Sequence, residues 1–151
     1  MEIFELSEKT EYQELAIDYF WKCWGNDSNF IFYKDCIIHS ILEKNILPKF
    51  YIGLEKGEIV GSYALLTNDL ISRQDLLPWF ACLYVNQASR KKGYAEMLLN
   101  HGIVQSKIMG YKNLYLSTDL VNFYERKGWR FFSKGYSPFG EEFRIYSIAT
   151  E

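Results

Sequence analysis

The segment Trp79–Val85 constrains the fold most, because all seven of its residues are apolar and a strand formed there would be apolar on both faces. Such a strand lies inside a sheet that is covered on both sides. A basic stretch with one glycine, Arg90–Ala95, comes next, and apolar and small residues then recur at a helical period over Gly93–Met109. The sequence therefore predicts a central strand, a turn, and a helix that packs on the sheet through small residues.

Further strands and helices are predicted on both sides of this unit. Periodicity and turn residues place a strand over 2–6, helices over 10–24 and 30–43, strands over 50–55 and 58–67, then a strand at 114–116, a short helix over 119–127 and strands over 129–136 and 142–148. We expect Thr10 to cap the first helix and Gly128 to end the short one. This order predicts one α+β (mixed α/β) domain over residues 1–151, with a central mixed, mostly antiparallel sheet and helices on both faces.

Composition excludes several classes of function. A formal net charge of -2 and a sequence pI near 5.8 give no global basic field for a nucleic-acid partner. The three cysteines, Cys23, Cys36 and Cys82, have no metal-ligand spacing and cannot all pair, which is typical of reduced thiols in a cytoplasmic protein. No apolar run approaches the length needed to cross a bilayer, and no secretory leader pattern is seen, so we expect no membrane partner.

The stretch Arg90–Ala95 has the features of an anion-binding loop. A strand followed by a glycine-containing turn and a helix presents unpaired backbone N–H groups at the positive end of the helix dipole. Gly93 leaves room for a phosphate to approach the backbone, and Arg90, Lys91 and Lys92 add positive charge. A basic turn before a helix is also common as solvated surface, so this segment alone leaves both interpretations open.

Two motifs resemble those of the GNAT acetyltransferase superfamily. Arg90, Gly93 and Ala95 match its Gln/Arg-x-x-Gly-x-Gly/Ala signature directly after the central strand, and the three-glycine dinucleotide fingerprint is absent. Downstream, Tyr124-Glu125-Arg126-Lys127-Gly128-Trp129 resembles the family's Tyr-x-x-x-Gly-Phe ending, with Trp in place of Phe. The chain also looks like a bacterial branch of this family in four stretches: Leu116–Asp119, Phe123–Glu125, Gly140–Glu141 and Arg144–Tyr146. The resemblance covers residues 79–136 and extends loosely over the chain as a single GNAT-like domain.

The resemblance implies a cosubstrate, acetyl-CoA, and a set of residues that bind it. In the family, the pantetheine arm pairs with the backbone of the central strand, and the basic loop holds the diphosphate. Carried over to this sequence, the cofactor-binding residues are Leu83, Tyr84, Val85, Arg90, Lys91, Lys92, Gly93, Tyr94, Ala95 and Asn122. No metal is implied, because His39 and His101 lie on separate predicted helices.

The resemblance also implies N-acetyl transfer by direct attack of a primary amine, with Tyr124 as general acid for the leaving thiolate. The alternative is that Tyr124 is an aromatic residue of the hydrophobic core with no role in catalysis. Many family members place a glutamate on the central strand, whereas Trp79–Val85 contains no acid. Asp119 could take the proton directly or through a water, or could cap a helix instead. The acceptor would be a small-molecule, peptide or protein amine, and the alternative is an inactive CoA-binding sensor or regulatory module. Exposed sheet edges are compatible with a homodimer.

Overall fold

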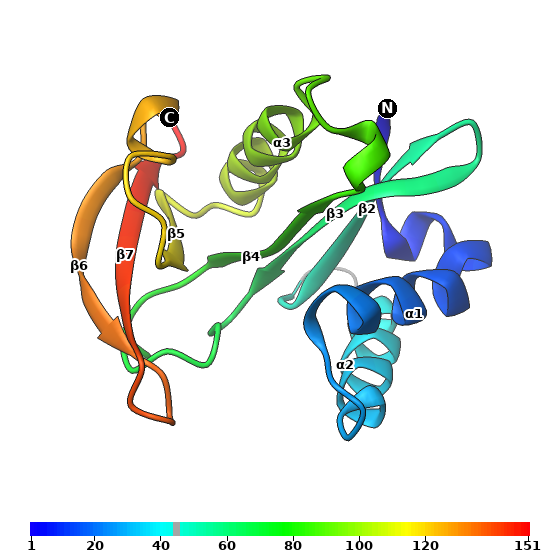
Figure 1. Ribbon diagram of the computed structural model, residues 1–151, viewed down its shortest axis with the longest axis horizontal. Helices are drawn as coiled ribbons and strands as arrows, with labels where there is room; N and C mark the ends of the chain where they lie inside the picture. The colour runs from blue at the N-terminus through cyan, green and yellow to red at the C-terminus, as the bar shows by residue number, and fades with distance from the viewer. Residues whose placement is uncertain (44–45) are drawn as a thin grey trace. The chain divides into compact units, whose positions relative to one another are not determined.

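The computed structural model describes residues 1–43 and 46–151, which form two compact units (Figure 1). The first contains residues 1–64 and 82–98, and the second contains residues 65–81 and 99–151. The helices and strands are β1 (Glu2–Glu5), α1 (Gln13–Trp24), α2 (Phe30–Leu42), β2 (Lys49–Glu55), β3 (Glu58–Leu66), β4 (Trp79–Val85), α3 (Tyr94–Ile108), β5 (Asn113–Thr118), β6 (Arg130–Tyr136) and β7 (Glu142–Ala149).

The strands form one mixed sheet in the order β1-β2-β3-β4-β5-β7-β6. β4 and β5 are parallel, with Trp79 opposite Tyr115. The pairs β1 with β2, β5 with β7, and β6 with β7 are antiparallel. The predicted fold class, a mixed and mostly antiparallel sheet with helices, is confirmed.

In the first unit, α1 and α2 lie on one side of the strands and the beginning of α3 lies on the other (Figure 1). On the α1 side, Phe20 meets Phe50 of β2 edge to face, with ring centroids 5.0 Å apart. On the α3 side, the close approach depends on Gly61 of β3. A Cβ at this position would lie 3.1 Å from a methyl of Leu98 and 3.1 Å from the backbone oxygen of Tyr84. A glycine at this position therefore lets the first turns of α3 pack on the sheet.

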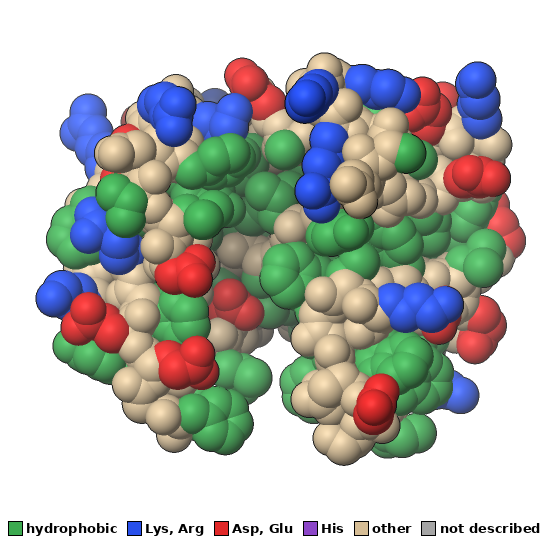
Figure 2. All heavy atoms as spheres, in the orientation of Figure 1, with side chains coloured by type: hydrophobic (Ala, Val, Ile, Leu, Met, Phe, Trp, Pro, Cys, Tyr) green, Lys and Arg blue, Asp and Glu red, His purple; other side chains and the backbone are tan. Residues whose placement is uncertain are grey.

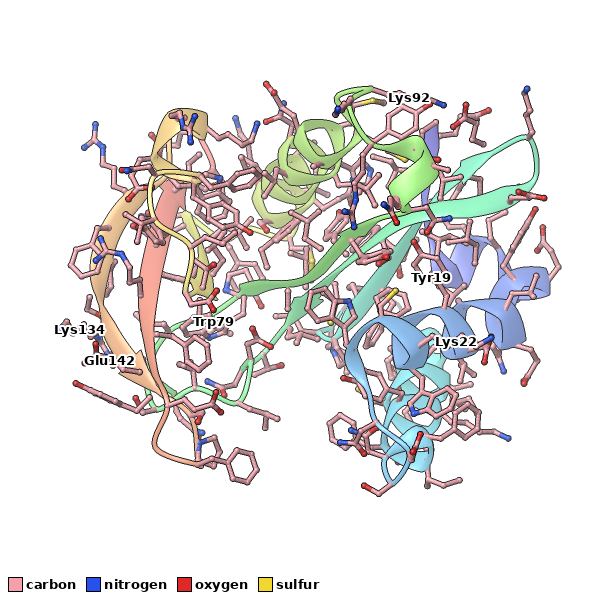
Figure 3. The ribbon with its side chains drawn as sticks, viewed as in Figure 1. Tyr19, Lys22, Trp79, Lys92, Lys134 and Glu142 are labelled. Atoms are coloured by element: carbon pink, nitrogen blue, oxygen red, sulfur yellow. The ribbon has the colours of Figure 1, made fainter. Side chains whose placement is uncertain are left out.

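In the second unit, Trp79 at the start of β4 anchors the core. Its side chain is fully buried and packs with Ile71, Leu76 and Ile145. The indole Nε1–H donates to the backbone oxygen of Leu76 at 2.6 Å, and the ring lies 6.1 Å from that of Tyr115 on β5 (Figure 3). The β3–β4 loop is therefore held against β5 by its own buried side chains.

The start of the first helix differs from the prediction. Residues Thr10–Tyr12 form a short 3-10 turn, and the α-helix begins at Gln13. No side-chain hydrogen bond caps α1, so the predicted cap at Thr10 is wrong.

The predicted helix over 119–127 is reduced to a 3-10 turn at Glu125–Lys127. Asn122 has a φ of 67°, a left-handed conformation that cannot continue a right-handed helix. The N–H of Leu120 is bonded by the Thr118 hydroxyl at 3.0 Å. The interpretation of Asp119 as a helix cap is therefore wrong, whereas Gly128, with φ 86°, ends the turn as predicted.

Candidate functional site

The central strand β4 contains a backbone irregularity at Cys82. This residue has a φ of 55°. A positive φ is rare for residues other than glycine, asparagine and aspartate, and it is unusual within a strand. The buried Ser62 hydroxyl of β3 donates to the Cys82 backbone oxygen at 3.1 Å. Such irregularities bend a strand and re-aim the residues that follow. The conformation at Cys82 therefore sets the direction of Leu83–Val85, which are three of the predicted cofactor-binding residues.

We expect Ser62→Ala to destabilise the fold modestly. The substitution removes one buried hydrogen bond at the Cys82 carbonyl, which should lower the free energy of unfolding by about 1 kcal/mol. Urea denaturation followed by circular dichroism measures this change, with Ser28→Ala in an exposed turn as the control. Equal stability of Ser62→Ala and the unmodified protein would show that this bond does not hold the irregularity.

The loop before α3 presents a row of free backbone donors. Lys91 and Gly93 have φ values of 65° and 77°, and the first helical bond runs from the Met97 N–H to the Gly93 oxygen at 3.1 Å. Within residues 1–43 and 46–151, the N–H groups from Lys91 to Ala95 have no hydrogen-bond acceptor. A Cβ at Gly93 would meet nothing within 4 Å. The loop therefore offers open space, unpaired donors and the positive end of a helix to an anion.

Side chains around the loop hold its shape. Arg90 donates from Nε to the backbone oxygen of Val85 at 3.0 Å, and its guanidinium lies 5.6 Å from the centre of the Tyr84 ring. The predicted phosphate ligand Arg90 thus also ties the loop to the end of β4. Figure 2 shows lysine and arginine side chains gathered over the segment that leads into α3, where Arg90, Lys91 and Lys92 are all exposed.

Glu55, at the end of β2, is a loop partner that the sequence did not indicate. The Tyr94 hydroxyl donates to its carboxylate at 2.9 Å, and Lys92 Nζ lies 3.6 Å from it (Figure 3). The Tyr94 hydrogen bond, with help from Lys92, holds the pKa of Glu55 below its usual value, and the same bond raises the pKa of Tyr94. Glu55 thereby fixes the first helical residue and one of the loop lysines.

Asn86 fixes the point at which β4 ends. Its N–H donates to the Val60 oxygen at 2.8 Å, and its side-chain amide donates to the Ile59 oxygen at 3.1 Å. The amide oxygen accepts from the Tyr19 hydroxyl of α1 at 2.6 Å (Figure 3), and burial raises the pKa of Tyr19. These three hydrogen bonds of Asn86 lock the junction to β3 and α1. An open cleft of about 620 Å³ lies beside it, bordered by Tyr19, Lys22, Tyr84 and Asn86.

Tyr124 lies in the second unit with its ring largely buried. The ring packs edge to face on Phe123 and Trp129, at centroid distances of 4.9 and 6.2 Å, and lies 6.1 Å from Tyr146. In the described part of the chain, its hydroxyl has no hydrogen-bond partner. Burial raises the pKa of Tyr124, so the phenol keeps its proton at neutral pH. The side chain is both a packed aromatic and an available proton donor.

The Tyr146 ring is itself held in place by two polar side chains. Its hydroxyl donates to Glu125 at 2.5 Å and accepts from Arg144 Nε at 2.9 Å. These bonds fix one wall of the Tyr124 environment. The Tyr146 bond also lowers the pKa of Glu125, so this carboxylate stays charged.

The remaining predicted site residues lie on the segment before Tyr124. Asp119 and Asn122 are both exposed, and the Asn122 backbone oxygen accepts from Arg126 Nε at 2.7 Å. The predicted residues Leu83–Val85 and Arg90–Ala95 belong to the first unit, whereas Asp119, Asn122 and Tyr124 belong to the second. The structure brings the members of each group together within their own unit.

The described residues contain neither a metal-ligand cluster nor a membrane-spanning helix. Among residues 1–43 and 46–151, no three His, Cys, Asp or Glu side chains are grouped closely enough to hold a metal ion. No helix in the same residues combines the length and apolar character needed to cross a membrane.

Comparisons with known proteins agree with this arrangement. The family model described as "Acetyltransferase (GNAT) domain" matches residues 47–131, which is more than half of the chain. The match includes β4, the basic loop, α3 and Tyr124. The chain therefore belongs to the GNAT acetyltransferase family. No curated protein matches the sequence.

Solved structures of low sequence identity share the fold. An aminoglycoside 6'-N-acetyltransferase complexed with coenzyme A is 14% identical, with a TM-score of 0.73 over 100% of this chain and 98% of the other. An aminoglycoside 6'-acetyltransferase type Ii is 16% identical, with a TM-score of 0.74 over 100% and 98%. A GNAT-family acetyltransferase from Staphylococcus aureus Mu50 is 19% identical, with a TM-score of 0.70 over 99% of each chain.

Proposed function

We propose that this protein is an N-acetyltransferase that moves an acetyl group from acetyl-CoA to a primary amine of a small molecule, peptide or protein. The observation that carries the proposal is the loop before α3. Its N–H groups from Lys91 to Ala95 have no acceptor among the described residues, and the space at Gly93 is open, in a chain of the GNAT family. A diphosphate needs several charge-assisted donors in one small volume, and this loop supplies them.

Other residues would complete the acetyl-CoA site. Lys91 and Lys92 would add charge to the diphosphate, and the backbone of Leu83–Val85 would bond the pantetheine arm. The Val85 oxygen already accepts from Arg90, so it is not available to pantetheine. Asn122 is the remaining residue proposed to bind acetyl-CoA. Acetyl-CoA, when bound, supplies the acetyl group as an activated thioester.

Tyr124 is proposed as the general acid. The leaving sulfur resembles a cysteine thiolate, whose parent pKa is about 8.5, so a nearby phenol can give it a proton or a hydrogen bond. The raised pKa of Tyr124 keeps that proton in place up to alkaline pH, and its hydroxyl is not engaged elsewhere among the described side chains. Direct transfer needs no nucleophile from the protein. The thiol of Cys82, which is partly buried on β4, is therefore given no nucleophilic role.

Small-molecule amines are the first acceptors to test. Two of the structural neighbours are aminoglycoside acetyltransferases, and aminoglycosides carry several amines. The formal net charge of -2 permits a cationic acceptor.

The alternative is a CoA-binding sensor or regulatory module without turnover. The observation in its favour is that β4, from Trp79 to Val85, has no acidic side chain to act as a base. The two functions share the loop and differ in catalysis.

A thiol-release screen separates them. The purified protein is mixed with acetyl-CoA and a panel of aminoglycosides, polyamines, amino acids and peptide N-termini, and free thiol is followed over time. An acetyltransferase releases thiol in an amine-dependent way. Calorimetric binding of acetyl-CoA with no thiol release from any amine would favour the sensor, and absence of binding would contradict both.

A further inference from the structure

The β3–β4 loop carries a carboxylate that the mechanism above does not use. Asp69 is partly buried in the second unit, and its Oδ2 accepts from the Ser117 hydroxyl of β5 at 3.5 Å, the outer limit of a hydrogen bond. Among the described residues, this is its one polar contact. The carboxylate is therefore held near β5 but is not engaged by a cation.

The backbone around Asp69 is fixed rather than free. The Asn68 side-chain oxygen accepts from the Ile71 N–H at 3.0 Å, and Leu70 has a φ of 52°. The Ile71 side chain is buried in the core with Trp79. The turn closed by the Asn68 side chain and the buried Ile71 side chain fix the backbone that follows Asp69. They thereby hold the Asp69 carboxylate in one place.

Ser117 places this carboxylate near the C-terminal end of β5. The residue lies two positions after Tyr115, on the same face of the strand, and Tyr115 pairs with Trp79 at the start of β4. β5 ends at Thr118, and the chain then runs through Asp119 into the segment that carries Tyr124. Asp69 is therefore close to the strand that leads directly to the proposed general acid.

An unpaired donor lies beside Asp69. The Asn68 Nδ2 group is buried and has no hydrogen-bond partner in the part of the chain that the structure describes. Buried polar groups are almost always hydrogen-bonded, so each exception calls for a reason. The Asn68 amide therefore leaves an unsatisfied polar group next to Asp69 in the chain.

The electrostatic surroundings suit a base rather than a structural ion. Burial raises the pKa of Asp69 to about 6, and the Ser117 hydrogen bond opposes this rise. On the same loop, Arg73 is occupied by Asp75, with bonds of 2.8 and 2.7 Å, and the β7 residue Arg144 donates to Tyr146. Lys134 and Glu142 pair with each other at 3.5 Å (Figure 3). A base whose pKa lies near the working pH transfers protons most effectively.

We infer that Asp69 is the general base of the proposed acetyl transfer, held by Ser117 to receive the proton of the acceptor amine. The inference rests on the proposed function. The amine first gives up one proton to water and enters in its neutral form. As its nitrogen forms the bond to the acetyl carbon, the nitrogen loses one further proton to the Asp69 carboxylate. The carbon–sulfur bond breaks with its electron pair on sulfur, and the sulfur takes one proton from Tyr124. Asp69 thereby acts as the general base, which β4 cannot provide because it has no acidic side chain.

Asp69→Asn tests this role through turnover and its pH dependence. We expect kcat/KM for the best amine to fall by about 100-fold, because general base catalysis contributes on the order of 10² to 10⁴. In the unmodified enzyme kcat/KM should fall as the pH drops through the Asp69 pKa of about 6, and this acid limb should vanish in Asp69→Asn. Ser117→Ala should move the limb to higher pH. Asp27→Asn, in the exposed turn before α2, is the control and should stay within about twofold.

A stability measurement distinguishes catalysis from a structural role. The pKa of Asp69 is raised from 3.8 to about 6 on folding, so its stabilising contribution is complete below pH 4 and is lost as the pH rises through 6. Removing the charge should therefore stabilise the fold above that window. We expect Asp69→Asn to raise the melting temperature at pH 7.5 by roughly 3 to 6 °C and to leave it unchanged at pH 4. Loss of activity together with increased stability is not expected of a residue that only supports the fold.

The outcomes separate this inference from the proposed function. Amine-dependent turnover that is equal in Asp69→Asn and the unmodified enzyme overturns the role of Asp69 and leaves the acetyltransferase standing. No turnover with any amine overturns both. Carbon-13 NMR titration of the Asp69 carboxyl, assigned with Asp69→Asn, gives a readout without activity, and an ordinary carboxyl pKa would also overturn the inference.

Discussion

Tyr124→Phe is expected to lower kcat by about 100-fold at saturating acetyl-CoA, because it removes the only proton donor of that side chain. The phenylalanine ring keeps the packing against Phe123, Trp129 and Tyr146, so the fold and the KM for acetyl-CoA should change little. Initial rates of thiol release over a range of acetyl-CoA concentrations measure both parameters. The loss should appear in kcat because the proton is needed only as the carbon–sulfur bond breaks.

Tyr111→Phe is the matched control for this variant. Tyr111 follows the C-terminal end of α3, and its recorded hydrogen bonds involve its backbone rather than its hydroxyl. Its removal should leave kcat within about twofold. Full turnover by Tyr124→Phe would remove Tyr124 from the chemistry and leave it as a packing residue.

Gly93→Val is expected to weaken CoA binding by about 10- to 100-fold, as the loss of one charge-assisted hydrogen bond of 1.5 to 3 kcal/mol predicts. The valine side chain would occupy the open space above the loop donors and would strain a backbone with φ 77°. Isothermal titration calorimetry with CoA gives the dissociation constant directly, without an acceptor amine.

Gly110→Val controls for backbone strain. Gly110 has a φ of 88°, and a Cβ there would also meet nothing within 4 Å, so the two substitutions carry similar conformational cost. Gly110 follows the C-terminal end of α3, where no diphosphate is expected. The Gly110 variant should bind CoA as the unmodified protein does. Equal weakening in both variants would assign the effect to stability rather than to the loop.

The parts of the fold that the sequence predicted are those that local patterns specify. The run Trp79–Val85 is apolar on both faces, which predicts a strand inside a sheet. The glycine at position 93 and the small residues that follow it predict the loop and the start of α3. Because these signals are local, they were readable without knowledge of the tertiary structure. The mixed sheet and the family membership followed from them and are confirmed.

The parts that were missed depend on contacts between distant segments. Glu55 reaches Tyr94 across 39 positions of sequence, and Ser117 reaches Asp69 across 48. Neither carboxylate differs in its local sequence from a solvated surface residue, so no pattern could identify it. The helix expected over 119–127 failed for a different reason, since a single left-handed residue, Asn122, interrupts it.

The acetyl group of acetyl-CoA is expected to pass to the nitrogen of an acceptor amine. Mass spectrometry of the products formed from acetyl-CoA carrying a carbon-13 label in its acetyl group, with the best acceptor of the screen, tests it most directly. We predict one labelled acetyl group on the amine for each free thiol released. Thiol release with the label recovered as free acetate, or an amine that stays unlabelled while acetyl-CoA is consumed, would contradict the account.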